Sequence, residues 1–207
     1  MKLVSLLSSG IDSPVATYLL SKKVDELILL HADNRPFTDD REIDNFIQIF
    51  NHLEKIINKK IRAYIIPNGE SLNSYIKNCN VRYTCIFCKR MLLRYAEKIA
   101  KLKRVDAIIM GDSLGQVASQ TLQNIRTIED GVSLPVLRPL IGFDKEEIIK
   151  IAKEIGTYDL SILPSLECKA IPNKPATMAK LENILNEEEK IDINKLVKNA
   201  IKNIKII

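Results

Sequence analysis

Short apolar runs recur along the first half of the chain, and stretches with helical periodicity separate them. The runs are Leu3–Leu7, Leu27–Leu30, Ala63–Ile66 and Ala107–Met110. Short, mostly apolar runs of this length are typical of strands that are buried on both faces, as they are in a parallel sheet. Because these strands alternate with helices, the pattern predicts an α/β fold.

Two of the helical stretches have clear boundaries. In residues 39–58 the apolar side chains recur on one helical face, and Asp39 and Glu42 have the spacing of a helix start signal. The apolar face consists of Ile43, Phe46, Ile47, Phe50, Leu53 and Ile57. A second helix begins at Asp144, which has the same spacing to a glutamate, and ends at Gly156.

The pattern changes after Pro175 into two polar helical stretches. An acidic run at Glu187–Glu189 precedes a series of lysines, Lys190, Lys195, Lys198, Lys202 and Lys205. Runs of charge are usually solvated surface, so we expect these helices to form a small solvated appendage rather than a binding element. The sequence thus divides into one domain over residues 1–175 and a helical C-terminal extension over residues 176–207.

The composition is that of an ordinary globular protein, because 46% of the 207 residues are hydrophobic and 28% are charged. Subtracting 26 acidic from 31 basic side chains leaves a net charge of +5, which permits a polyanionic partner without requiring one. No apolar run is long enough for a membrane span, and the first residues lack the features of a signal peptide. We therefore expect a cytoplasmic protein with no membrane partner, in which four cysteines favour metal or sulfur chemistry over a disulfide framework.

The first candidate site is the loop Ser8–Pro14, which follows the first predicted strand. Pro14 suits the first position of a helix that Ser13 caps. Backbone N–H groups at such a helix start, together with serine hydroxyls, form a cradle for phosphate. Because the carboxylate of Asp12 would repel that phosphate, its presence indicates a bridging Mg²⁺ ion. An ordinary strand-to-helix turn is the alternative, since neither a Gly-x-Gly dinucleotide fingerprint nor a Walker loop is present.

The segment Ser8–Ser13 (SSGIDS) resembles the Ser-Gly-Gly-x-Asp-Ser loop of the PP-loop ATP pyrophosphatases, with Ser9 in place of the first glycine. This serine would restrict the loop if the position needs a positive φ. Three further segments narrow the resemblance to the catalytic domain of the tRNA 4-thiouridine synthetases, the ThiI-like tRNA sulfurtransferases. They are Gly111–Leu122 (GDSLGQVASQTL), Leu137–Lys145 (LRPLIGFDK) and Ile155–Tyr158 (IGTY). The resemblance extends from about Leu3 to Pro175.

This resemblance implies a five-stranded parallel sheet with helices on both faces, of the adenine nucleotide alpha hydrolase type, with ATP at the carboxyl ends of the strands. It also implies a reaction in which uridine O4 attacks the α-phosphorus of ATP, pyrophosphate leaves, and a sulfur nucleophile then displaces AMP from C4. Asp12 would hold Mg²⁺ in this reaction. The residues assigned to ATP are Ser8, Ser9, Gly10, Asp12, Ser13, His31, Gly111, Asp112, Ser113 and Gln116.

The two histidines carry weaker signals. His31 closes the second strand and would line the adenosine pocket, although a strand-end position without a chemical role is the simpler interpretation. His52 has the position of a solvated residue in the middle of a helix.

The cysteines form the second candidate site. Cys85 and Cys88 lie in a Cys-x-x-Cys pair that opens a predicted helix, where unpaired N–H groups and the helix dipole favour thiolate over thiol. Both should therefore be reactive or bind a metal. With Cys79 and Cys168 they would complete a tetrahedral zinc site, and a reversible disulfide is a further alternative.

The resemblance favours a different metal site. Cys168 occupies the place where these synthetases keep a cysteine that is important for sulfur transfer. Some members carry a persulfide on an added rhodanese domain, whereas others hold an iron–sulfur cluster on three cysteines of the catalytic domain. A chain with the Cys-x-x-Cys pair and no rhodanese domain is similar to the second kind, with a [4Fe–4S] cluster on Cys85, Cys88 and Cys168 and with Cys79 outside it. The iron without a cysteine would bind the sulfur that attacks the activated base.

A basic stripe begins at the cysteine pair. Residues 89–104 contain seven basic side chains against Glu97 alone, and the local balance of 7 − 1 = +6 exceeds that of the whole chain. Helical spacing turns one set of side chains toward the core, namely Met91, Leu92, Tyr95, Ile99 and Leu102. It places a second set on one outer face, namely Arg90, Arg94, Lys98 and Lys101. We expect this outer face to contact the tRNA backbone without reading its sequence.

These features together predict an ATP-dependent tRNA sulfurtransferase that adenylates a uridine, at position 8 as the family implies, and makes 4-thiouridine. The alternatives are another PP-loop tRNA thiolase of the 2-thiouridine or 2-thiocytidine type, an amide-forming ATP pyrophosphatase, or a nucleotide- and metal-binding module that has lost catalysis. The chain starts on its first strand at Lys2, without the THUMP-containing RNA-binding region that is usual in the family. We therefore expect a separate RNA-binding partner or a homodimer, and the sequence does not indicate the sulfur donor.

Overall fold

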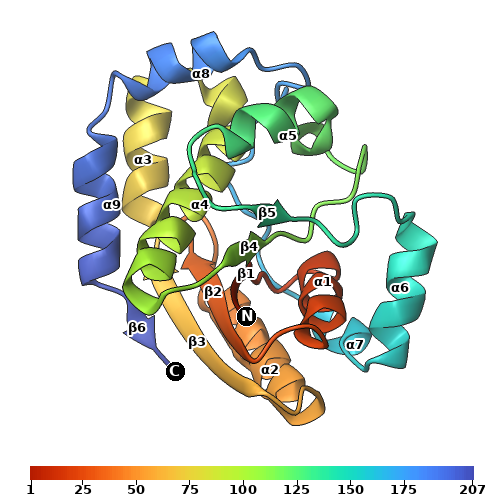
Figure 1. Ribbon diagram of the computed structural model, residues 1–207. Helices are drawn as coiled ribbons and strands as arrows, with labels where there is room; N and C mark the ends of the chain where they lie inside the picture. Colours follow the sequence, from red (N-terminus) through yellow and green to blue (C-terminus); the bar gives the residue numbers. More distant parts are fainter.

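A six-stranded sheet lies between two layers of helices in the computed structural model, which describes residues 1–207 (Figure 1). The strands follow the order β5-β4-β1-β2-β3-β6 across the sheet. They are β1 (Lys2–Leu6), β2 (Glu26–Asp33), β3 (Lys60–Pro67), β4 (Ala107–Ile109), β5 (Val136–Leu137) and β6 (Lys205–Ile206). The first four coincide with the apolar runs in the sequence, so the predicted α/β fold is confirmed.

The central strands are buried on both faces, which explains why their residues are mostly apolar. Leu3 of β1 lies opposite Leu27 of β2 and Ala107 of β4, and all three side chains are buried. Strands β1 to β5 run parallel and form the five-stranded sheet that the resemblance implied. The sixth strand is an addition at the edge, where β6 pairs antiparallel with β3. It is two residues long, which is too short to give a strand signal in the sequence.

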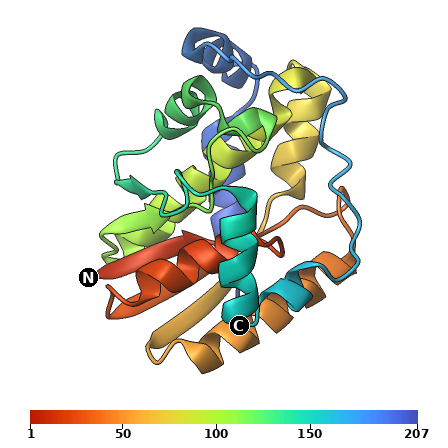
Figure 2. The same ribbon diagram turned by 90° about the vertical axis from the view of Figure 1, so that its right-hand side faces the viewer.

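Four helices cover one face of the sheet (Figure 2), namely α1 (Asp12–Ser21), α2 (Asp40–Ile56), α6 (Lys145–Glu154) and α7 (Tyr158–Ser161). Phe46 of α2 and Ile148 of α6 are fully buried in the core that these helices share with the sheet. Asp144 caps α6 by exchanging two hydrogen bonds of 2.8 Å with Glu147. Gly156 follows that helix with a φ of +74°, a conformation that favours glycine. The predicted boundaries of α2 and α6 are therefore confirmed to within two residues.

Five helices cover the other face of the sheet: α3 (Gly69–Asn78), α4 (Thr84–Lys103), α5 (Leu122–Glu129), α8 (Leu181–Glu188) and α9 (Ile193–Lys202). The 3₁₀ turns η1 (Val81–Tyr83) and η2 (Ala118–Gln120) precede α4 and α5. Helix α4 packs against β1, β4, α3, α5 and α9, and its Phe87, Met91 and Tyr95 are fully buried. It is the central helix of this layer.

The C-terminal helices are not the solvated appendage that the sequence predicted. Ile184 of α8 and Leu196 of α9 are buried in the same core as the residues of α3 and α4, and α9 lies beside α3 (Figure 1). The prediction failed because the lysines of α9 occupy only part of its circumference. Leu196, Val197 and Ala200 form an apolar stripe that faces the core. The change of pattern after Pro175 therefore introduces a segment that belongs to the same core.

Two further side chains differ from their predicted positions. His52 is not solvated surface, because its Nε2 lies 2.7 Å from the carbonyl oxygen of Ile155 and its ring packs against Gly156. It thereby joins α2 to the end of α6. Leu102, which helical spacing placed toward the core, is 72% exposed, because all residues of the last turn of α4 are exposed. None of the nine helices combines the length and the apolar character that crossing a membrane requires.

Candidate active site

The loop between β1 and α1 is held in shape by its own serines. The backbone N–H of Ser8 donates to Oγ of Ser13 at 2.9 Å, and the two serine hydroxyls lie 3.0 Å apart. Helix α1 begins at Asp12, so the prediction that Ser13 caps the helix and Pro14 occupies its first position is wrong. The Ser13 hydroxyl binds across the loop instead. The result is a closed turn at a helix N-terminus, which is an arrangement that suits phosphate.

The end of β4 closes against this loop from the neighbouring strand. Gly111 approaches so closely that a Cβ atom there would lie 2.7 Å from Cα of Ser13. Strands β1 and β4 are adjacent although the chain leaves them toward opposite sides of the sheet, which makes their carboxyl ends the switch point where α/β sheets bind ligands. A cavity of about 240 Å³ lies there, which we call the loop cavity. It is lined by Leu6, Ser8, Gly10, Ile11, Asp12, Ser13, Lys89, Leu92, Met110, Gly111, Asp112 and Gln120.

Paired charges surround the loop cavity. Oδ1 of Asp12 lies 2.6 Å from Nζ of Lys145, at the start of α6. Asp112 is buried and binds Lys89 at 2.6 Å and Arg138 at 3.0 Å. Although burial alone would raise the pKa of Asp112, the charges and hydrogen bonds of Lys89 and Arg138 hold it below its usual value. Cations fixed in this way are suited to stabilising the charge of a bound triphosphate.

His31 and Ser9, two of the residues assigned to ATP, stabilise the loop through hydrogen bonds with Leu7 and Glu42. His31 is buried, its Nδ1 lies 2.9 Å from the carbonyl oxygen of Leu7, and its ring stacks on Phe46. Its Nε2 lies 2.8 Å from Glu42, whose other carboxylate oxygen accepts a hydrogen bond of 3.4 Å from Ser9. Neither His31 nor Ser9 lines the loop cavity. The structure therefore corrects the expected direct contact of His31 with the nucleotide, because both ring nitrogens already have partners.

Ser113 and Gln116 also lie outside the loop cavity. Ser113 is fully buried and donates to the carbonyl oxygen of Phe143 at 2.7 Å, while Nε2 of Gln116 donates to Ser113 at 3.0 Å. These bonds join the segment after β4 to the segment after β5. Gln120, which the sequence did not single out, does line the cavity, and its amide lies 3.5 Å from Asp112.

Three of the four cysteines face a second cavity of about 400 Å³, which we call the thiol cavity. Cys85 and Cys88 come from the start of α4, as predicted, and Cys168 comes from the irregular segment after α7. Cys79 lies elsewhere, and its Sγ donates to the carbonyl oxygen of Glu187 at 3.2 Å. The structure thus brings together the three cysteines that were assigned to a cluster and separates the fourth, which disfavours the alternative zinc site on four cysteines.

Burial determines the protonation of these thiols. It raises the pKa of Cys85 and of Cys168, and it raises the pKa of Cys88 to about 12. The predicted thiolates are therefore wrong for the protein without a ligand, because desolvation outweighs a helix dipole that contributes about 1 kcal/mol or less. As the side chains stand, no group of three or more His, Cys, Asp or Glu residues converges closely enough to hold a metal ion.

The loop cavity and the thiol cavity share a wall. Lys89 and Leu92, on the turn of α4 that follows Cys88, line both of them. Sequence reasoning counted Lys89 only as one charge of the basic stripe. Its position four residues after Cys85 was the available signal, since residues i and i+4 of a helix lie on the same face. A molecule bound in one cavity is therefore close to the contents of the other.

Only some side chains of the basic stripe are exposed on the surface. Arg90 is 1% exposed, and it and Arg94 bind the buried carboxylate of Glu188 at 2.8 Å and 2.6 Å. Their assignment as RNA contacts is therefore wrong, because α8 covers that part of α4 and supplies a counter-charge. Lys98 and Lys101 are exposed, as the helical spacing predicted.

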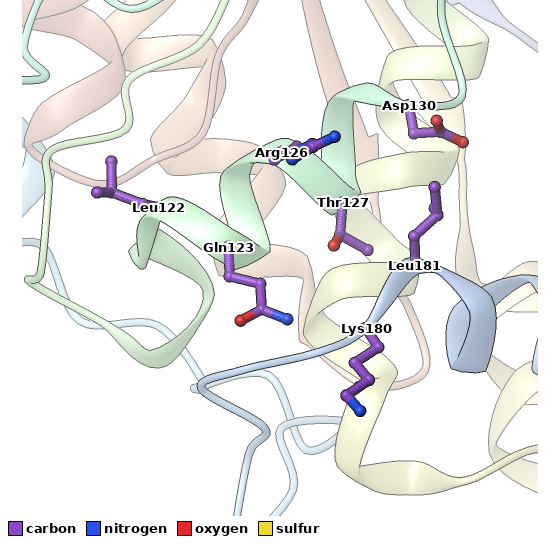
Figure 3. Close-up of a pocket in the computed structure, with 7 residues that line it drawn as sticks. All are labelled: Leu122, Gln123, Arg126, Thr127, Asp130, Lys180 and Leu181. Carbon is purple, nitrogen blue, oxygen red and sulfur yellow. The ribbon is translucent and has the colours of Figure 1, made fainter.

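A further hollow of about 540 Å³ lies between α5 and the start of α8 (Figure 3). None of the residues assigned to ATP, metal or RNA lines it, and only Leu122 belongs to a segment that carries the family resemblance. Its charged groups, Arg126, Asp130 and Lys180, are of both signs, and the hollow contains no cysteine and no loop of unpaired N–H groups. The chemistry of the molecule is concentrated at the loop and thiol cavities instead.

Comparisons with known proteins agree with this arrangement. The chain matches the family model described as "Thiamine biosynthesis protein (ThiI)" over residues 1–193. A protein of Finegoldia magna named "Probable tRNA sulfurtransferase" is 42% identical over 204 residues, which cover 98% of this chain and 52% of the relative. A protein of the same name from Methanosarcina mazei is 38% identical over 207 residues, which cover 100% of this chain and 51% of the relative. The chain thus spans about half the length of the curated relatives it matches.

Solved structures extend the comparison to the fold. A crystal structure of a 4-thiouridine synthetase–RNA complex with bound ATP superimposes with a TM-score of 0.95 at 35% identity, and the match covers 100% of this chain and 54% of that one. An NMN synthetase from Francisella tularensis matches with a TM-score of 0.55 at 12% identity over 97% of this chain and 83% of that one, which is a likeness of fold alone.

Proposed function

The chain belongs to the ThiI family, and from this premise we propose that it is the ATP-dependent catalytic part of a tRNA sulfurtransferase that makes 4-thiouridine. One observation carries the proposal. The loop cavity, which suits phosphate, and the thiol cavity share Lys89 and Leu92 as a wall, so that a base beside this wall is within reach of ATP in the first cavity and of a sulfur in the second. This arrangement suits a reaction that activates an oxygen and then replaces it by sulfur.

The first step belongs to the loop cavity. Uridine O4 attacks the α-phosphorus of ATP, the new O4–P bond forms, and the bond from that phosphorus to pyrophosphate breaks. The loop Ser8–Ser13 holds the leaving pyrophosphate through its N–H groups and hydroxyls. Lys89 and Lys145, fixed by Asp112 and Asp12, stabilise the charge that develops on the phosphates.

The second step belongs to the thiol cavity. A sulfur nucleophile adds to C4 of the adenylated uridine, the C4–O4 bond breaks, and AMP leaves with the oxygen. Adenylation is necessary because the carbonyl oxygen of uridine is a poor leaving group, whereas a phosphate ester is a good one. The mostly apolar lining disfavours water beside the activated base, and water there would return the base to uridine.

The residues that line the two cavities are of the types that the two inorganic cofactors implied by the family require, although the thiols do not converge on one point as they stand. Asp12 would hold Mg²⁺, which would neutralise phosphate charge beside the loop. The three thiols spread around one cavity, while Cys79 points elsewhere, and this suits a cluster with three cysteine ligands better than a single four-coordinate ion. Such a cluster would leave one iron without a protein ligand and would supply bound sulfur there.

A direct assay tests the proposal. The chain is incubated with α-labelled ATP, Mg²⁺, unmodified tRNA and sulfide, and the nucleosides of the tRNA are then separated by chromatography. We expect AMP, pyrophosphate and 4-thiouridine, and we expect no 4-thiouridine in a tRNA whose uridine at position 8 is replaced by cytidine. Release of ADP and phosphate would contradict adenylation, and a 2-thiolated product would favour the other thiolases. The expected RNA-binding partner, the homodimer and the cytoplasmic location stay predictions.

A further inference from the structure

A second groove adjoins the thiol cavity. It has a volume of about 580 Å³ and is lined by Ile76 and residues 81, 82 and 169–174. Ala170 and Ile171 line this groove and the thiol cavity alike, so the segment that carries Cys168 forms the rim between them. We call this hollow the basic groove because of its charge.

Three cations of the groove have no acidic partner. Arg82, Lys169 and Lys174 are exposed, none of them forms an ion pair, and no Asp or Glu lines the groove. In contrast, the cations around the loop cavity, the buried Arg90 and the partly buried Arg94 are all paired with carboxylates. Three positive charges gathered without counter-charges favour an anionic partner with several charges.

Apolar side chains lie among these cations. Val81 is 45% exposed and Ile171 is 55% exposed, although both belong to residue types that are usually buried. A surface that offers both cations and apolar contacts suits an unpaired nucleic-acid strand, whose phosphates bind the cations while its bases pack on the apolar groups. A duplex would present its phosphates but not the faces of its bases.

We propose that the basic groove holds the phosphate backbone of tRNA next to the target uridine, and that the base passes Ala170 and Ile171 into the thiol cavity. This inference rests on the proposed function and specifies how its RNA substrate approaches. A base must leave its stack before an enzyme can alter C4, and a mostly apolar cavity of about 400 Å³ beside the strand gives it a place to go. The groove thus replaces the buried arginines as the predicted RNA contact.

The test is tRNA affinity as a function of salt. The variant Arg82→Gln/Lys169→Gln/Lys174→Gln should bind unmodified tRNA at least about tenfold more weakly near 100 mM salt, and the slope of log affinity against log salt should fall by about two. The matched control is Lys23→Gln/Lys59→Gln/Lys60→Gln, which removes the same charge from exposed, unpaired lysines at the amino ends of β2 and β3. This control should lose less than about twofold, because its charges act only at long range.

Each outcome decides the question. Equal losses of tRNA affinity in both triple variants would show that only net charge matters and would overturn the groove proposal. Unaltered affinity in the groove variant would overturn it too. So would an absence of tRNA binding by the unsubstituted chain near 50 mM salt. Arg82 also donates to the carbonyl oxygen of Lys174 at 3.3 Å, so Lys169→Gln/Lys174→Gln repeats the test with that contact intact. If the groove variant loses RNA affinity but the unsubstituted chain makes no AMP, the groove stands and the proposed function falls. If the groove variant and the unsubstituted chain form 4-thiouridine equally well, the groove proposal is wrong while the proposed function holds.

Discussion

The loop cavity and the thiol cavity share Lys89 but differ in charge and in construction. Around the loop cavity, Asp12 and Asp112 each bind a lysine at 2.6 Å, and much of the wall is formed by the segments that directly follow β1 and β4. Around the thiol cavity, burial raises the pKa of Cys88 to about 12, and one wall is the irregular segment that contains Cys168. The difference assigns two tasks to two environments: paired charges where phosphate charge moves, and an apolar enclosure where sulfur must compete with water.

The largest effects are expected from two substitutions that block adenylation and sulfur transfer separately. Asp12→Asn should lower tRNA-dependent pyrophosphate release by roughly 10²- to 10³-fold, because it removes the charge that binds Lys145 and the proposed Mg²⁺. Cys88→Ala should abolish 4-thiouridine formation and the release of AMP while one pyrophosphate per tRNA is still released, since its thiol faces only the thiol cavity. Pyrophosphate released from γ-labelled ATP measures the first step, and nucleoside chromatography measures the second.

Cys79→Ala is the matched control for this pair of variants. Its thiol lies outside both cavities, packs against the core and donates a hydrogen bond to a backbone carbonyl group of α8, so both steps should proceed. If Cys88→Ala also stops pyrophosphate release, the two cavities do not divide the reaction as proposed. Loss of thiouridine in Cys79→Ala would restore the zinc site on four cysteines as the better interpretation.

The loop cavity was largely predictable from the sequence, because its main element is a contiguous loop. A strand, a run of small polar residues and a helix start within residues 8–14 carry their own signal. The sequence could not show the ion pairs between residues that are far apart in the chain. Lys145 lies 133 residues after Asp12, and only the folded sheet brings their charges together.

The basic stripe shows the limit of helical periodicity. The spacing of Arg90 and Arg94 correctly placed them on one face of α4, but it could not show what covers that face. Their partner, Glu188, is 98 residues from Arg90 and lies in a segment that resembled a solvated tail. Periodicity predicts which residues share a face, whereas burial of that face depends on a contact that only the tertiary structure reveals.

The second prediction concerns the ion pair of Glu188 with Arg90, whose loss should disturb both cavities through α4. Glu188→Ala leaves Arg90, which is 1% exposed, without its carboxylate and should lower the free energy of unfolding by about 3 to 5 kcal/mol. Because α4 carries the shared wall, AMP release and thiouridine formation should then fail together at moderate temperature. Glu189→Ala, which removes an exposed carboxylate one residue later, should change stability by less than about 0.5 kcal/mol in urea titrations.

The pH dependence of this effect has a definite sign. Burial alone would raise the pKa of Glu188, but the hydrogen bonds from Arg94 and Arg90 lower it below its usual value. A carboxyl group with a depressed pKa in the folded state stabilises the protein fully above its unfolded pKa of about 4.3 and loses this contribution as the pH falls through the folded value. The stability difference between the unsubstituted chain and Glu188→Ala should therefore be constant near neutral pH and shrink below about pH 4. A difference that grows toward low pH would contradict the pairing.

The third prediction concerns the loop cavity alone. Gly111→Ala would place a Cβ atom 2.7 Å from Cα of Ser13, so β4 or the loop must move. We expect a loss of about 1 to 3 kcal/mol in stability and a smaller ATP-induced rise in Tm. Gly142→Ala, where a Cβ atom would meet nothing within 4 Å, is the control and should leave both quantities nearly unchanged. An ATP response that survives Gly111→Ala would show that the nucleotide does not rely on this part of the loop.

The smallest expected effect tests the one departure of the loop from the resembled pattern. Ser9 stands where the PP-loop motif has glycine, yet its φ is not positive, and its hydroxyl makes only a 3.4 Å bond to Glu42. Ser9→Gly should therefore lower stability by about 0.5 kcal/mol, through backbone entropy and the lost hydrogen bond, and should change the rate of AMP release by less than about twofold. Ser13→Ala in the same loop should have a larger effect, because its hydroxyl accepts the N–H of Ser8 at 2.9 Å. A large gain of activity in Ser9→Gly would mean that the serine impairs the loop, which would revive the alternative of a nucleotide-binding module that has lost catalysis.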